Sequence, residues 1–246
     1  MITFDNTEIA FESKSDKDLN RAYQLFKLIG NRNLVKIGKP LANFALNVGL
    51  PVKGIIRSTI FAQFCGGETI NECDQTINNL GKFGIGTILD YSVEGKTTDK
   101  DFEDTTNEII ATILKGTNNP YIPFAVFKVT GISRFELLEK ANDGVEKLTE
   151  AELAEYNHLL ERVDRICKTG FEKDVPVFID AEETWIQDTI DRIAYDMMLK
   201  YNKEKAIVYN TVQIYRHDRL AYLHKEIEAS KRDGIKYGVK LVRGAY

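Results

Sequence analysis

Val177-Phe178-Ile179-Asp180-Ala181-Glu182-Glu183 is a short apolar run that ends in a cluster of acids, and similar runs recur after Gly84. The candidate strands are Gly86 to Tyr91, Phe124 to Thr130, Val175 to Asp180, Ile207 to Ile214 and Val239 to Arg243. The stretches between them have helical patterns: Thr97 to Lys115, Phe135 to Lys168, Glu183 to Tyr201 and Asp218 to Arg232. Because strands and helices alternate, and the strands start about 30–50 residues apart, the pattern predicts a parallel sheet with helical crossovers.

Two α/β architectures fit this alternation, a doubly wound sheet and a (β/α)8 barrel. The first strand is followed by Asp90-Tyr91-Ser92-Val93-Glu94-Gly95, which is not the G-x-G-x-x-G sequence of a dinucleotide-binding turn. We therefore favour a TIM-type barrel that is incomplete here, with about five of its eight strands. The sequence ends directly after the fifth strand, which would leave an open sheet edge. We expect the chain to be the N-terminal portion of a longer protein.

The first part of the chain has a different pattern and contains no convincing strand. Helical spacing of apolar residues predicts helices at Asp16 to Ile29, Leu41 to Val48 and Glu68 to Leu80. The sequence thus predicts a small N-terminal helical domain at residues 1–83, followed by the first part of the barrel at residues 84–246.

Composition excludes several classes of protein. The chain holds 33 basic and 37 acidic residues, and no basic stretch resembles a nucleic-acid footprint, so no nucleic-acid partner is expected. Cys65, Cys73 and Cys167 lack zinc-ligand spacing, so we expect no metal and mostly buried, reduced thiols. No run approaches the ~20 apolar residues that span a bilayer. The residues from Met1 to Ser13 lack a secretory signal, which predicts a cytoplasmic protein.

Polar residues gather where the predicted strands end, which is where barrel enzymes place their sites. Asp90, Lys128, Asp180, Gln213 and Lys240 come from five different strands. Three of them also have a structural interpretation: Lys128 could pair with an aspartate in the barrel mouth, Asp180 could cap the next helix, and Gln213 could line a polar centre. Convergence from separate strands favours a ligand site.

Several of these segments together resemble one family, the proline dehydrogenases. Val177 to Glu183 resembles the aspartate-bearing third-strand motif, and Val239-Lys240-Leu241-Val242-Arg243-Gly244-Ala245-Tyr246 resembles the fifth-strand motif. Val212 to Tyr215 is similar to the glutamine-bearing fourth strand, and Phe127 to Val129 to the lysine-bearing second strand. The segment Phe64 to Glu68 resembles the bacterial monofunctional branch.

The resemblance implies a distorted (β/α)8 barrel with FAD at its carboxyl face. It also implies a reaction in which hydride leaves C5 of L-proline for flavin N5 and the product is Δ1-pyrroline-5-carboxylate. Electrons would then pass to a quinone, with peripheral contact at the inner face of the cytoplasmic membrane. The cofactor would carry the redox chemistry, while the protein positions proline and tunes the flavin.

The resemblance also implies a role for each matching residue. Lys128 would bind the proline carboxylate, Asp180 would hold the polar network beneath substrate and flavin, and Tyr246 would pack against the proline ring. Glu94 matches a residue that gates the site.

The cofactor-binding set implied by the resemblance lies on the fourth and fifth strands. Gln213 would bond the pyrimidine side of the isoalloxazine, while Val242 and Arg243 would contact the flavin. Lys240 occupies a position near N5 that is commonly arginine in the family, and lysine keeps the charge without the planar fork.

One departure from the family pattern bears on activity. The family's final helix carries a Tyr-x-x-Arg-Arg motif that grips the proline carboxylate, and this sequence contains neither it nor strands six to eight. We therefore expect the 246-residue chain to be inactive by itself. Alternatives are an aldolase with Lys128 as a Schiff-base lysine, another flavin reductase, or a non-enzymatic truncated homologue.

Overall fold

The computed structural model describes residues 4–91 and 97–244. The chain divides into two compact units, Met1–Ile85 and Gly86–Tyr246, and each is described here by itself. The domain boundary predicted at residue 83 stays a prediction, because compactness alone does not show that either unit folds independently.

The first unit is helical. Its helices are α1 (Thr7–Ala10), α2 (Asp16–Ile29), α3 (Arg32–Asn47), α4 (Lys53–Ile56), α5 (Ala62–Phe64) and α6 (Asp74–Gly81), with a π-helical turn at Arg57–Phe61. Ser15 opens α2 with a capping box that includes Asp18. The helix predicted to start at Leu41 is wrong, because Asn31 accepts hydrogen bonds from Asn33 and Leu34 and starts α3 well before Pro40.

The second unit contains a five-stranded parallel sheet. Its strands are β1 (Ile88–Leu89), β2 (Phe124–Phe127), β3 (Val177–Ile179), β4 (Val208–Gln213) and β5 (Gly238–Val242). They are hydrogen-bonded in the order in which they occur along the chain. A doubly wound sheet reverses its strand order part-way across, whereas a (β/α)8 barrel does not. The sequential order confirms the barrel-type α/β fold, with five of its strand units present.

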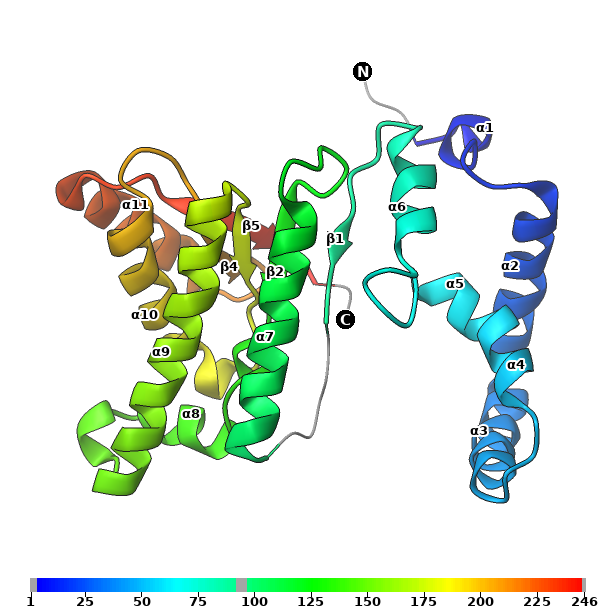
Figure 1. The fold of residues 1–246 in the computed structure, drawn as a ribbon, viewed down its shortest axis with the longest axis horizontal. Helices are drawn as coiled ribbons and strands as arrows, with labels where there is room; N and C mark the ends of the chain where they lie inside the picture. Colours follow the sequence, from blue (N-terminus) through cyan, green and yellow to red (C-terminus); the bar gives the residue numbers. More distant parts are fainter. Residues whose placement is uncertain (1–3, 92–96, 245–246) are drawn as a thin grey trace. The chain divides into compact units, whose positions relative to one another are not determined.

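The helices of this unit alternate with the strands. They are α7 (Asp99–Gly116), α8 (Phe135–Asn142), α9 (Glu150–Lys173), α10 (Thr184–Tyr201) and α11 (Arg219–Asp233), and Figure 1 shows α7, α9 and α10 running alongside the sheet. The single helix predicted from Phe135 to Lys168 is wrong. Gly144 has φ 141° and ends that run, and Thr149 then starts α9 with a capping box to Glu152.

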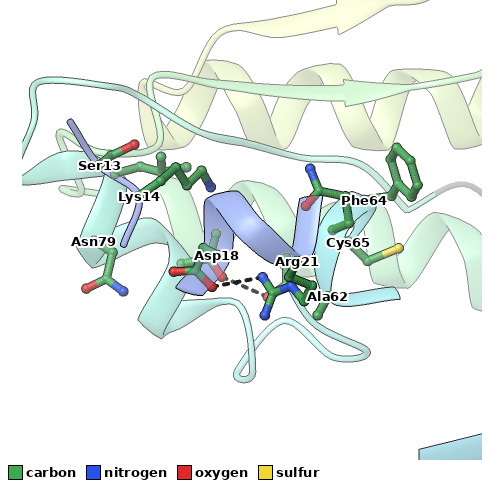
Figure 2. A pocket seen from close by; sticks show the side chains of 12 residues that line it. Ser13, Lys14, Asp18, Arg21, Ala62, Phe64, Cys65 and Asn79 are labelled. Carbon is green, nitrogen blue, oxygen red and sulfur yellow. Dashed lines mark hydrogen bonds and ion pairs between the residues drawn. The ribbon is translucent and has the colours of Figure 1, made fainter. Parts of the chain in front are cut away.

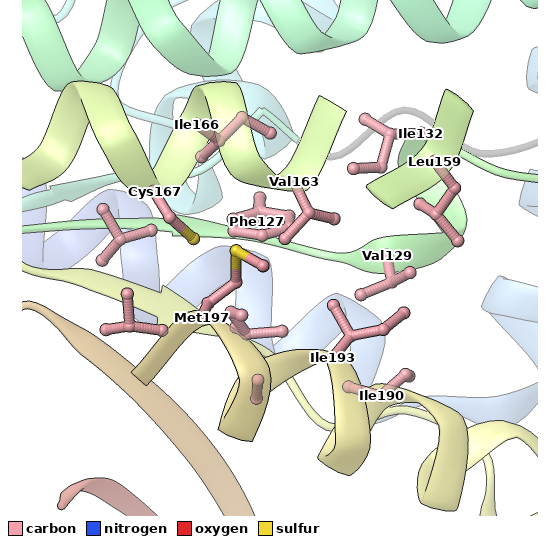
Figure 3. Close-up of a cluster of buried hydrophobic side chains, with 14 of the residues drawn as sticks. Phe127, Val129, Ile132, Leu159, Val163, Ile166, Cys167, Ile190, Ile193 and Met197 are labelled. Carbon is pink, nitrogen blue, oxygen red and sulfur yellow. The ribbon is translucent and has the colours of Figure 1, made fainter. Parts of the chain in front are cut away.

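The main core lies between the helices and one face of the sheet. Alternate strand residues such as Phe127 and Ile179 point to this side and are fully buried. Figure 3 shows Phe127 surrounded by side chains of α9 and α10, among them Val163, Ile193 and Met197. Because the core covers this face of the sheet, the opposite face is the one available for a binding site.

The three cysteines do not share one environment. Cys167 belongs to the core, and burial raises the pKa of its thiol. Cys65 is exposed and Cys73 is half-buried, so the expectation of mostly buried thiols is wrong. The two glycines that follow Cys65 favour a turn at the surface of the helical unit, and the exposure of Cys65 agrees with that interpretation.

Candidate functional site

The sheet face opposite the core, here called the inner face, begins with an aromatic cluster. Phe124 and Phe178 stack with ring centroids 4.4 Å apart, and Tyr209 meets both edge-on at 5.5 Å. The three rings come from the adjacent strands β2, β3 and β4. They share one face of the sheet, because side chains at in-register positions, and at positions two residues away, lie on the same side. Residues two and four positions further along the same strands therefore also belong to the inner face, towards its carboxyl edge.

An ion pair lies directly beyond the aromatic cluster. The Lys240 ammonium binds the Asp180 carboxylate, and Thr211 donates a hydrogen bond to the same carboxylate at 3.5 Å. Lys240 also lies 5.1 Å from the centroid of the Phe178 ring. The interpretation of Asp180 as a helix cap is wrong, since Glu183 is the N-cap residue of α10. Asp180 and Lys240 instead form a polar centre with partly exposed charges.

Lys128 lies at the end of β2, close enough to Glu182 for their charges to interact. The prediction that it sits inside the strand needs correction, because β2 ends at Phe127 and a 3-10 turn follows at Val129–Gly131. Lys128 is half-buried and forms no ion pair with any residue in the described ranges. The alternative of a Lys128–aspartate pair loses its best candidate, because Asp180 is bound to Lys240.

Glu182 is a site residue that the sequence reasoning did not single out. Its carboxylate accepts hydrogen bonds from the backbone N–H of Thr130, at 3.0 Å, and from the Thr130 hydroxyl. Burial raises the pKa of Glu182, while the Thr130 hydrogen bonds and the charge of Lys128 oppose that shift. The available signal was its spacing of two from Asp180, which places both carboxylates on one side of an extended segment.

Gln213 ends β4 and is buried. Its Nε2 donates to the Glu182 carbonyl at 2.8 Å. Its Oε1 is buried and has no hydrogen-bond partner among the residues that the structure describes. A buried acceptor without a donor is costly. This orphaned oxygen fits a ligand that presents an N–H group, as the pyrimidine ring of a flavin does.

The remaining predicted residues are placed only in part. Val242 pairs with Gln213 in the register of β4 and β5, and its carbonyl accepts the N–H of Ile214 at 2.9 Å. Arg243 follows the strand and is exposed. Glu94 and Tyr246 lie outside the described residues. The cofactor and substrate roles of all these residues stay predictions.

A separate pocket of about 320 Å³ lies within the helical unit (Figure 2). It is lined by α2, α5, α6 and the turn at Cys65 and Gly66. Its arginine, Arg21, pairs with Asp18 at 3.0 Å. None of the predicted site residues lines this pocket, so it is distinct from the inner face in its composition.

Two kinds of feature are missing from the described ranges, 4–91 and 97–244. No helix there has both the length and the apolar character required to span a bilayer. No group of three or more His, Cys, Asp or Glu side chains there is arranged to hold a metal ion.

The sequence and the fold of the chain are similar to those of known proteins. A family model described as proline dehydrogenase matches residues 73–246, which include all five strands. The chain belongs to the proline dehydrogenase family. The family resemblance predicted from the strand motifs is thereby confirmed.

Individual relatives agree with this membership. Proline dehydrogenase 1, mitochondrial, of Dictyostelium discoideum is 30% identical over 281 residues, covering 98% of this chain and 49% of the relative. The carbapenem antibiotics biosynthesis protein CarD of Pectobacterium carotovorum is 30% identical over 194 residues, covering 79% of this chain and 51% of its own length. The chain thus spans about half the length of these relatives.

Solved structures show the same fold at low identity. Proline utilization A (PutA) from Bdellovibrio bacteriovorus, inactivated by N-propargylglycine, aligns with a TM-score of 0.65 at 17% identity, over 98% of this chain and 26% of that one. PutA from Corynebacterium freiburgense aligns with a TM-score of 0.60 at 15% identity, over 87% of this chain and 21% of that one. At these identities the likeness concerns the fold.

Proposed function

We propose that this chain supplies the cofactor- and substrate-binding face of a proline dehydrogenase, which oxidises L-proline to Δ1-pyrroline-5-carboxylate with FAD and passes the electrons to a quinone. The proposal is supported by family membership and by the fold shared with PutA. FAD, when bound, takes up the two electrons that leave proline. The protein's part is to bind, orient and desolvate the reacting groups.

The observation that carries the proposal is the set of groups that converge on the inner face. The unpartnered Oε1 of Gln213 fits a flavin N–H donor. The Asp180–Lys240 pair adds a negative and a positive group next to β4, the strand that carries Gln213. Because Asp180 balances the charge of Lys240, the ammonium can stay in a partly buried place without a bound anion.

Proline needs its carboxylate held so that C5 faces the oxidant. Lys128 is the inner-face cation that has no ion pair within the described ranges, and it is half-buried. A charge-assisted hydrogen bond from its ammonium to the substrate carboxylate fits this geometry. We keep Tyr246 as the residue against the proline ring and Glu94 as the gate residue, both as proposals from the family resemblance.

A Lys128→Met variant tests this assignment. Removing one charged hydrogen bond should raise the KM for L-proline about 10- to 100-fold. The measurement is proline-dependent reduction of a quinone analogue by the protein expressed from its natural gene. Lys147→Met is the matched control, because Lys147 is exposed and lies 3.9 Å from Asp143 on the surface. An unchanged KM in Lys128→Met would remove Lys128 from the site.

Electron transfer to a quinone calls for contact with a lipid surface, and we assign that contact to the helical unit. Residues 19–67 hold seven Lys and Arg and no Asp or Glu, a segregation that the balanced charge of the whole chain hides. Leu34, Ile37, Leu41 and Phe44 share one face of α3 by their spacing and are all exposed. A basic segment with an exposed apolar helix face fits an anionic membrane surface. The cytoplasmic location stays a prediction.

Vesicle binding checks this assignment. The protein should sediment with vesicles containing anionic lipid and much less with neutral vesicles, and added salt should weaken the binding. Ile37→Glu should lower the binding about tenfold, because it places a carboxylate at the apolar face. Leu220→Glu on α11 is the control, since Leu220 is as exposed as Ile37, at 67%. Equal losses in the two variants would contradict the role of α3.

A further inference from the structure

A buried glutamine on α10 links the buried Asp191–Arg219 ion pair to the inner face. Gln187 is 1% exposed and makes two hydrogen bonds with its side-chain amide. Its Nε2 donates to Asp191 at 2.8 Å, and its Oε1 accepts the backbone N–H of Glu182 at 2.8 Å. Gln187 therefore connects the helix to the segment that follows β3.

Asp191 fixes which way the Gln187 amide points. Its carboxylate accepts from Gln187, from Asn210 at 2.8 Å, and from Arg219 at 2.7 Å. All four side chains are buried. A carboxylate accepts hydrogen bonds only, so it requires the NH2 group of Gln187 to face it. The opposite end of the amide, the oxygen, must then face Glu182.

The peptide of Glu182 is held from both sides. Its N–H donates to Gln187, and its C=O accepts Nε2 of Gln213 at 2.8 Å. Because a carbonyl accepts only, the NH2 group of Gln213 must point to Glu182. The Gln213 oxygen is thereby directed away from Glu182, where it remains without a partner in the part of the chain that the structure describes.

We propose that Gln187 is a positioning residue, which, anchored on Asp191, holds the Glu182 peptide so that Gln213 presents its oxygen as the acceptor for the cofactor ring. The inference rests on the proposed function, since the donor it requires is the ring N–H of a flavin. It adds a buried residue of α10, outside the inner face, to the machinery that orients the cofactor.

Titration of the apoprotein with FAD, followed by flavin fluorescence and absorbance, tests the proposal in the protein expressed from its natural gene. Gln187→Met and Gln213→Met should each raise the Kd for FAD about tenfold and shift the flavin absorption bands. If Gln187 acts through Gln213, the double variant should bind FAD about as weakly as Gln213→Met alone.

Thr189→Val is the matched control, because Thr189 is also fully buried on α10 and bonds Leu138 and Arg192 instead of Glu182. It should lower thermal stability and leave the Kd for FAD and the flavin bands unchanged. Additive losses in the double variant, or a Gln187→Met variant that behaves like Thr189→Val, would overturn the positioning role. A wild-type protein that binds no FAD would instead overturn the proposed function, so the two failures are distinguishable.

Discussion

In the protein expressed from its natural gene, an Asp180→Ala variant should lose about 100-fold in kcat/KM for L-proline. Asp180 accepts hydrogen bonds from Lys240 and Thr211 at the centre of the inner face. Without the carboxylate, the half-buried ammonium of Lys240 loses its counter-charge and turns toward water or toward the substrate carboxylate. One or two charged hydrogen bonds, each worth about 1.5–3 kcal/mol, account for a loss of this size.

Steady-state kinetics with a quinone analogue measures this effect. Asp180→Asn should lose less than the alanine variant, because it keeps the shape and an acceptor oxygen while removing the charge. Glu183→Ala is the control on the same segment, since Glu183 is exposed and makes no capping hydrogen bond with its side chain. If Asp180→Ala retained wild-type kcat/KM, the Asp180–Lys240 pair would be structural and outside the site.

An Asp191→Ala variant should lower the free energy of unfolding by about 3–5 kcal/mol. The substitution removes the acceptor for Gln187, Asn210 and Arg219 together, which leaves three buried donor groups to be rearranged. Arg219 keeps its contact with Asp218, so its guanidinium still has a counter-ion. For a chain of this size, such a loss corresponds to about 10 °C in Tm.

Thermal unfolding followed by circular dichroism measures the second effect. Asp188→Ala is the control, because Asp188 lies one turn earlier on α10, is 61% exposed and reaches Arg219 only at 3.6 Å. A surface pair of this kind contributes about 0–1 kcal/mol. Equal shifts in Tm for the two variants would contradict the view that Asp191 is the hub that joins α10, β4 and α11.

The order and type of the barrel elements could be predicted from the sequence because their patterns are strong. The β2 and β3 segments are continuous apolar runs that alternate with charged helices, which is typical of strands covered by crossovers. The break at Gly144 was missed because the residues before and after it keep helical spacing. The positive φ of Gly144, a 3-10 turn at Val145–Lys147 and the capping box of Thr149 and Glu152 together separate α8 from α9, and hydrophobic periodicity contains none of these signals.

The individual site residues could be predicted from the sequence, but the hydrogen bonds and ion pairs between them could not. Asp180 and Lys240 are far apart in the sequence and meet because β3, β4 and β5 pair in one particular register. Gln187 and Asp191 have the spacing of an ordinary helix surface pair. Their burial depends on how α10 packs against β4, which the pattern of α10 alone does not reveal.

The inner face is proposed to hold a flavin that L-proline reduces. The most direct measurement is an anaerobic titration with L-proline of the protein purified from its natural gene, followed by the visible absorbance. We expect a yellow protein whose flavin bands bleach with L-proline and bleach far less in Asp180→Ala at the same concentration. A colourless protein, or a flavin that stays oxidised in L-proline, would contradict the proposed function, and borohydride trapping at Lys128 would then test the aldolase alternative.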